Sequence, residues 1–285
     1  MFKAVTIALL AAALTSACVK KEESNVVSGG SASPSSPMFW SGNPFPLNIY
    51  LSDAFTTQQA DAIKRGGNSW ETALGGKNWF DFNPVAQHEV TNSAFSGDAL
   101  GRDNQIVVYK TTQWQSDRGV IAYAQNMVTA YNEGTSSEYR IISSSDIMVN
   151  FRDNTFRDAV VTTGDYDLET VILHEFGHML GLLHTDQYPS SNKNTSVMYP
   201  SIGRGDTRRT PFQPDKNKLA GLYNLNPNGS NISGASASAG APMERYVPFD
   251  DGREIMIQIE LRKTGECVHK ENGVIVHRHH SPNFK

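Results

Sequence analysis

One short segment in the second half of the chain limits the choice of fold more than any other feature. Residues 174 to 184 read His-Glu-Phe-Gly-His-Met-Leu-Gly-Leu-Leu-His. On a helix, residues four apart project from one face with their side chains about 5–6 Å apart, so His174 and His178 would face one ion. Gly181 can adopt the left-handed conformation that ends a helix. The chain would then turn and bring His184 to the same ion.

These three histidines predict a catalytic zinc site. Zinc binds imidazole nitrogen at about 2.0–2.1 Å, and three neutral protein ligands leave one tetrahedral position open, as a catalytic zinc requires. Glu175 follows the first ligand and points about 100° away around the helix, which places it beside the metal. There it is suited to take a proton from metal-activated water and pass it to a leaving amine. A helix with incidental histidines and a structural zinc site are the alternatives, but a structural site normally uses four protein ligands.

The spacing H-E-x-x-H-x-x-G-x-x-H resembles that of the metzincin zinc metallopeptidases, and the surrounding residues are similar to the matrixins within that clan. Residues 167 to 173 lead into the motif as the family's helix does, and Ser196-Val197-Met198-Tyr199-Pro200 resembles its Met-turn. The resemblance covers roughly residues 45 to 225. It implies an α+β fold, a metzincin-like catalytic domain with a twisted mixed sheet, an active-site helix and a C-terminal helix.

The same resemblance implies roles for residues around the metal. Met198 would form a hydrophobic floor beneath the ligands. Tyr199, Pro200 and Ile202 would line the pocket for the residue after the cleaved bond. Residues 142 to 151 would form the edge strand of the sheet, where an extended protein or peptide substrate adds as a further strand. The implied function is that of a zinc metalloendopeptidase, a hydrolase acting on peptide bonds.

One catalytic zinc is expected, because no histidine between His88 and His174 is available to build a second, structural zinc site. A calcium ion at Asp153, Asp158 or Asp165 stays open beside the plainer interpretation of these residues as solvated charges. Two further features differ from the matrixin pattern. Thr185 stands where matrixins usually have serine after the third histidine, and no cysteine-switch propeptide is recognisable.

The N-terminal residues have the features of an export signal. Residues 1 to 17 combine a lysine near the start, a short apolar run and small residues before a cysteine, which is typical of a signal peptide. Leu14-Thr15-Ser16-Ala17-Cys18 resembles a bacterial lipoprotein lipobox, which implies lipidation of Cys18 and attachment to a membrane, in the periplasm or at the cell surface. Secretion after simple cleavage is the alternative. Residues 18 to 38 are polar and rich in serine and glycine, as in a flexible tether.

The remaining sequence divides into a main domain, residues 39 to 226, a linker, residues 227 to 242, and a small β unit, residues 243 to 285. In the β unit, Asn272-Gly273 between two apolar segments predicts a hairpin. Cys267 has no disulfide partner within the chain if Cys18 is lipidated, because the sequence has only these two cysteines. Within the main domain, periodicity and capping residues predict strands at 47–51, 105–109 and 145–151 and helices at 56–74, 168–180 and 214–223. The expected N-cap is Thr56 or Thr57 for the first helix and Asp167 for the second.

Composition narrows the range of partners. The formal net charge is -4, with a pI near 6.1, whereas proteins that bind nucleic acid usually carry a basic excess. We therefore expect no nucleic-acid partner, a monomer, and protein or peptide substrates. The alternative to an enzyme is a catalytically silent, surface-anchored binding protein that retains the zinc fold.

Overall fold

The computed structural model describes residues 36–42, 44–82, 105–114, 117–158, 164–185, 195–225 and 251–280. The predicted signal peptide, Cys18, most of the tether and the linker at 227–242 lie outside these ranges. Within the described ranges, no helix has the length and apolar character needed to cross a membrane.

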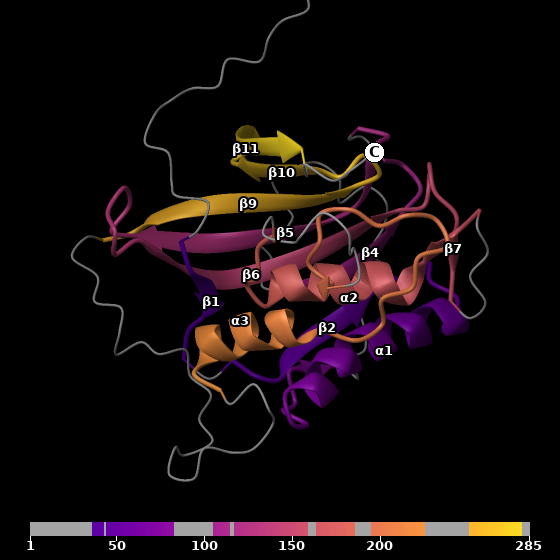
Figure 1. Ribbon diagram of the computed structural model, residues 1–285, viewed down its shortest axis with the longest axis horizontal. Helices are drawn as coiled ribbons and strands as arrows, with labels where there is room; N and C mark the ends of the chain where they lie inside the picture. Colours follow the sequence, from indigo (N-terminus) through magenta and orange to yellow (C-terminus); the bar gives the residue numbers. More distant parts are fainter. Residues whose placement is uncertain are drawn as a thin grey trace, which may run out of the picture.

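The described strands form one large mixed sheet and one small one, and the helices lie together on one side of the large sheet (Figure 1). In the large sheet the order is β11-β10-β9-β5-β6-β4-β2-β3, with β1 paired to β6. The predicted α+β fold with a mixed sheet, an active-site helix and a C-terminal helix is confirmed. The strands are β1 (Met38–Trp40), β2 (Leu47–Leu51), β3 (Phe80–Asp81), β4 (Ile106–Thr111), β5 (Val120–Tyr131), β6 (Tyr139–Asn150), β7 (Phe156–Arg157), β8 (Tyr166–Asp167), β9 (Arg253–Arg262), β10 (Glu266–Glu271) and β11 (Val274–His280), and the helices are α1 (Thr57–Ala73), α2 (Leu168–Met179) and α3 (Gln213–Tyr223).

Helix α1 begins as its sequence predicts and packs closely against α2. Thr56 caps it through a capping box with Gln59, in which each side chain accepts from the other residue's backbone amide. Gly66 lets the backbones of α1 and α2 approach closely, since a β-carbon there would lie 3.1 Å from Ile172 Cγ2. Trp70 Nε1 then donates to the carbonyl of Leu173 at 2.9 Å. Helix α1 therefore supports α2 at Leu173, the residue that precedes the first predicted metal ligand.

The C-terminal end of α2 is held by β1 and α3. Trp40 Nε1 donates to the Met179 carbonyl at 2.8 Å, and the Tyr223 hydroxyl donates to the Leu180 carbonyl at 3.0 Å. The Trp40 amide donates in turn to the Tyr223 hydroxyl at 3.2 Å. These bonds satisfy carbonyls that the end of a helix leaves free. The fold thus includes the last residues of the predicted tether, because Ser36 is already buried and β1 begins at Met38.

The predicted position of the edge strand was wrong. Strand β6, which contains most of residues 142 to 151, lies between β5 and β4 in the sheet interior. The strand outside it is β5, which the sequence analysis did not identify. Nearly every residue of β5 is buried, so the segment lacks the polar–apolar alternation that marks a half-exposed strand.

The C-terminal residues form the predicted hairpin, but their strands do not fold as a separate unit. Asn272 and Gly273 both have positive φ, as the two-residue turn between β10 and β11 requires. However, β9 pairs with β5 along its length and extends the sheet of the main domain. Its inward side chains join the main core, with exposures of 0 to 3%; these are Ile255, Ile257, Ile259 and Leu261.

Gly181 is the position where the fold depends most on glycine. Its φ is +95°, and a β-carbon there would overlap the Met38 carbonyl oxygen. We expect Gly181→Ala to lower the free energy of unfolding by roughly 2–4 kcal/mol, because it combines backbone strain with a clash against β1. Urea denaturation of the metal-free protein measures this loss.

The matched control is Gly221→Ala in α3, where a β-carbon would meet nothing within 4 Å. Alanine is favoured over glycine in a helix by roughly 0.5–1 kcal/mol, so this variant should be equally or more stable than wild type. A Gly181→Ala variant as stable as the Gly221→Ala variant would contradict the interpretation.

Candidate metal centre

Helix α2 presents the metal-binding motif from a completely buried position. Asp167 caps its N-terminus by accepting from the Thr170 amide at 3.2 Å, as predicted. The same carboxylate is paired with Arg209 Nη2 at 2.6 Å, which compensates the burial of its charge. Beyond Leu180 the chain turns at Gly181, and the Leu182 amide donates to the Gly177 carbonyl at 2.9 Å. The turn directs His184 back toward the helix.

The three predicted ligands converge through their Nε2 atoms. His174 Nε2 lies 3.0 Å from that of His178 and 3.2 Å from that of His184, and the latter two are 3.2 Å apart. Ligand atoms bonded to a tetrahedral zinc at about 2.0–2.1 Å lie about 3.3–3.4 Å from each other. The nitrogen triangle therefore has nearly the size that one zinc ion requires.

Each imidazole is also oriented from behind through Nδ1. His174 Nδ1 lies 2.7 Å from the Val197 carbonyl, and His178 Nδ1 lies 2.7 Å from the Leu182 carbonyl. A carbonyl can only accept, so both rings carry their proton on Nδ1 and leave the Nε2 lone pair free for a metal. Burial lowers the pKa of His174 to about 3 and that of His178 well below its usual value. Both rings are therefore neutral, as metal ligands must be.

Glu175 provides the test of whether a metal fits this site. Its side chain is fully buried, and neither carboxylate oxygen has a hydrogen-bond partner of ordinary geometry within the described residues. Burial raises the pKa of Glu175 well above its usual value, and the backbone of Ala124 in β5 opposes this only in part. A buried carboxylate without a partner is costly. Its place in α2, directly after the ligand His174, fits a divalent cation with its coordinated water.

Met198 lies where the Met-turn resemblance places it. A β-carbon at Gly177 would overlap the Met198 sulfur, so the sulfur packs on the α2 backbone just before the second ligand. The turn is fixed by Asp215 of α3, which accepts from the Val197 amide at 2.9 Å and from the Ser196 hydroxyl. Helix α3 thus holds the floor beneath the three histidines.

The predicted substrate-pocket residues follow directly after this turn. Tyr199 and Ile202 are 4% and 1% exposed, and Pro200 is also buried. Ser201 forms a parallel bridge with Arg262 at the end of β9. None of these residues lines the cavity of about 580 Å³ next to His184. Their role in substrate binding stays a prediction.

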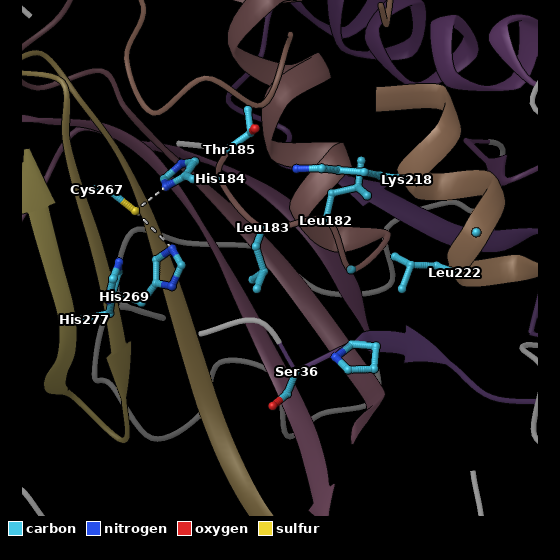
Figure 2. Close-up of a pocket in the computed structure, with 13 residues that line it drawn as sticks. Ser36, Leu182, Leu183, His184, Thr185, Lys218, Leu222, Cys267, His269 and His277 are labelled. Atoms are coloured by element: carbon cyan, nitrogen blue, oxygen red, sulfur yellow. Dashed lines mark hydrogen bonds between the residues drawn. The ribbon is translucent and has the colours of Figure 1, made fainter. Parts of the chain in front are cut away.

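The surroundings of the third ligand were not predicted from the sequence. Figure 2 shows Cys267 and His269 of β10 beside His184, on the wall of this cavity. Cys267 Sγ lies 3.1 Å from His184 Nδ1 and 3.3 Å from His269 Nε2. The available signal was the spacing of Cys267 and His269, which puts both side chains on one face of a strand. The sequence alone did not show that this face meets His184.

The three aspartates considered for calcium contact arginines instead. Arg152 Nη2 lies 2.6 Å from a carboxylate oxygen of Asp153, and Arg157 Nε lies 3.0 Å from one of Asp165. The backbone carbonyl of Asp158 accepts from Arg65 Nη2 at 2.9 Å. Calcium at these positions stays a prediction without a structural observation in its favour.

Comparison with known proteins agrees with this geometry. The family model described as matrixin matches residues 48–224. Among curated proteins, Metalloendoproteinase 5-MMP of Arabidopsis thaliana is 32% identical over 111 residues, which cover 39% of this chain and 27% of that protein. Metalloendoproteinase 2-MMP of Arabidopsis thaliana is 39% identical over 66 residues, or 23% of this chain and 16% of the relative. Metalloendoproteinase 1 of Glycine max is 38% identical over 65 residues, which cover 23% of this chain and 19% of that protein.

The chain therefore spans only about a quarter, or less, of the length of the curated relatives that it matches. The family model, in contrast, covers more than half of the chain and includes α1, α2, the Met-turn and α3. Matrixins are zinc metalloendopeptidases with a metzincin-like catalytic domain, which agrees with the mixed sheet and the three convergent histidines. This chain belongs to the matrixin family.

Proposed function

We propose that this protein is a zinc-dependent endopeptidase that hydrolyses extended protein or peptide substrates. The observation that carries the proposal is the convergence of three Nε2 atoms within 3.0 to 3.2 Å of each other. Two of them come from helix α2, which also carries Glu175, and the third comes from His184 after the turn. His174, His178 and His184 would hold the ion. Zinc, when bound, polarises a carbonyl and lowers the pKa of coordinated water.

Glu175 is the group that moves the proton. Its carboxylate would accept a proton from the attacking water, hold it on an oxygen atom and deliver it to the nitrogen of the leaving amine. Burial raises the pKa of this carboxyl well above its usual value, which makes the carboxylate a stronger base than a solvated glutamate. The fixed Nδ1 contacts of His174 and His178 keep the ligands in place during this transfer.

The expected substrate class follows from the strand beside α2. Asn126 Nδ2 of β5 donates to the His178 carbonyl at 3.1 Å, and the backbone of Ala124 faces Glu175. A polypeptide that added to β5 as a further strand would present its peptide bonds next to the metal. Main-chain pairing of this kind binds many sequences in extended form, which favours an endopeptidase for unfolded or flexible segments.

Replacement of Glu175 by glutamine tests the assignment. Glu175→Gln should retain one zinc per chain by elemental analysis, since the three histidines remain. The kcat/KM for reduced, carboxymethylated casein should fall by at least about a thousandfold, because glutamine cannot accept the proton. The comparison variant His178→Ala should lose both zinc and activity. Cleavage by Glu175→Gln at the wild-type rate would refute the role of Glu175.

We also propose that the protein is exported and anchored to a bacterial membrane by lipid on Cys18, and acts as a monomer without nucleic acid. The support is the signal-like sequence of residues 1 to 17 and the weak net negative charge. Cells fed an alkyne-labelled fatty acid should label the wild-type protein and the Cys267→Ser variant but not Cys18→Ser. Equal labelling of Cys18→Ser would exclude Cys18 as the anchor.

A further inference from the structure

The strand next to the metal site is already paired. All ten residues of β9 lie along β5 in antiparallel orientation, with Ile259 opposite Ala124 and Ile257 opposite Asn126. Ala124 faces Glu175, and Asn126 binds the helix that carries the ligands. Strand β9 therefore occupies the surface of β5 that an added substrate strand would use.

The far end of β9 also contacts the residues that follow the Met-turn. Arg262 bridges Ser201 in parallel orientation, while β9 remains antiparallel to β5. The end of β9 thus lies between β5 and the segment that follows the Met-turn. A substrate polypeptide would need the same passage to bring a peptide bond to the three histidines.

Side chains of β9 pack into the core that includes the metal-binding helix α2. Ile257 and Ile259 are 3% and 0% exposed and belong to the same core cluster as Phe176 of α2. With β9 in place, His174 and Glu175 have no exposed surface. A peptidase cannot admit a polypeptide to residues in this condition, so the structure represents a closed state.

Polar contacts fasten the C-terminal strands β9, β10 and β11 to the rest of the molecule. Cys267 Sγ lies 3.1 Å from His184 Nδ1, which places a thiol of β10 directly behind a metal ligand. Glu271 of β10 pairs with Arg140 of β6 at 2.7 Å. Arg253 at the start of β9 pairs with Glu133, after β5, at 2.6 Å. The Arg140–Glu271 pair is largely buried and the Arg253–Glu133 pair is partly exposed, and both stabilise the closed state.

We propose that β9, β10 and β11 form an intramolecular inhibitor that blocks the metal centre by taking the place of the substrate strand on β5. The matrixin match ends at residue 224, so these strands lie outside the part of the chain that the family model describes. Activity then requires β9 to leave β5. The inference rests on the proposed endopeptidase function, and its tests include a readout that needs no hydrolysis.

A reversible crosslink between β5 and β9 tests whether β9 must move. Gln125 and Gln258 are direct partners in the ladder, on the face of β5 opposite to Ala124. The α-carbons of such partners are about 4.5–5.5 Å apart, within the range of a disulfide. The oxidised Gln125→Cys/Gln258→Cys protein, with its crosslink verified by peptide mapping, should cleave carboxymethylated casein at least tenfold more slowly than the same protein reduced with a phosphine.

The matched control joins β10 to β11 within the C-terminal strands. Lys270 and Ile275 are also ladder partners, and a disulfide between Lys270→Cys and Ile275→Cys does not tether β9 to β5. Oxidation of this variant should change the cleavage rate by less than twofold. Inhibition of both crosslinked proteins to the same degree would show that oxidation itself causes the loss and would overturn the inference.

The second readout is the affinity of the tripeptide hydroxamate Pro-Leu-Gly-NHOH for the zinc-loaded β5–β9 crosslink variant that also carries Glu175→Gln. This probe needs access to the metal but no turnover. The oxidised β5–β9 crosslink should weaken its binding at least tenfold relative to the reduced protein. Equal affinity in both states would overturn the inhibitor proposal. A different result would separate the two proposals. If hydroxamate affinity differs tenfold between the two states but the reduced crosslink variant with Glu175 intact cleaves no casein, the endopeptidase function is refuted and the blocking role remains.

Weakening the fastening contacts should have the opposite effect. Arg253→Gln combined with Glu271→Gln removes two ion pairs, while Arg140 keeps its contact with Glu138 at 3.2 Å. We expect at least threefold faster casein cleavage and tighter hydroxamate binding. Arg157→Gln, which removes the ion pair with Asp165 at 3.0 Å, is the control and should change neither. Unchanged or reduced hydroxamate affinity in the double variant would contradict the proposal.

Discussion

The arrangement of this protein depends on bringing three imidazole rings to one point inside the folded core. The helical repeat aligns His174 with His178, and the turn at Gly181 returns the chain so that His184 meets them. Carbonyls behind the first two rings fix the proton on Nδ1. Burial keeps those rings neutral by lowering their pKa values. Each effect prepares a ligand set before any ion binds, so the protein carries the cost of ordering the site during folding.

The large sheet and the other helices serve to hold this one helix. Trp70 and Trp40 donate to carbonyls of α2 from opposite sides, and Asn126 reaches a third carbonyl from β5. Asp215 fixes the Met-turn beneath the ligands. These contacts come from segments far apart in sequence, and all of them end on backbone atoms. These contacts fix the backbone of the helix, and the Nδ1 contacts of His174 and His178 fix the orientation of their rings on it.

The side of β5 that faces away from β6 can bind a substrate strand, and for the same reason it needs protection from unwanted pairing. A strand with free main-chain groups beside a metal site can capture substrate, but the same groups can pair with any other strand and promote aggregation. In this chain β9 satisfies them, and its isoleucine side chains complete the core. The C-terminal strands thus pair the main-chain groups of β5 that would otherwise lie at an open sheet edge. As a consequence, His174 and Glu175 at the metal centre have no exposed surface.

The sequence by itself determined the local features. The spacing of the histidines, the Asp167 and Thr56 caps, the stop at Gly181 and the Asn272-Gly273 turn all follow from interactions within a few residues, and the structure confirms them. Only the tertiary structure decided which strand borders β5 and what lies behind His184. Strand β5 is buried on both faces and shows no alternation, and Cys267 meets His184 across 83 residues of sequence. Strand order and long-range contacts depend on the packing of the whole chain, which local periodicity does not encode.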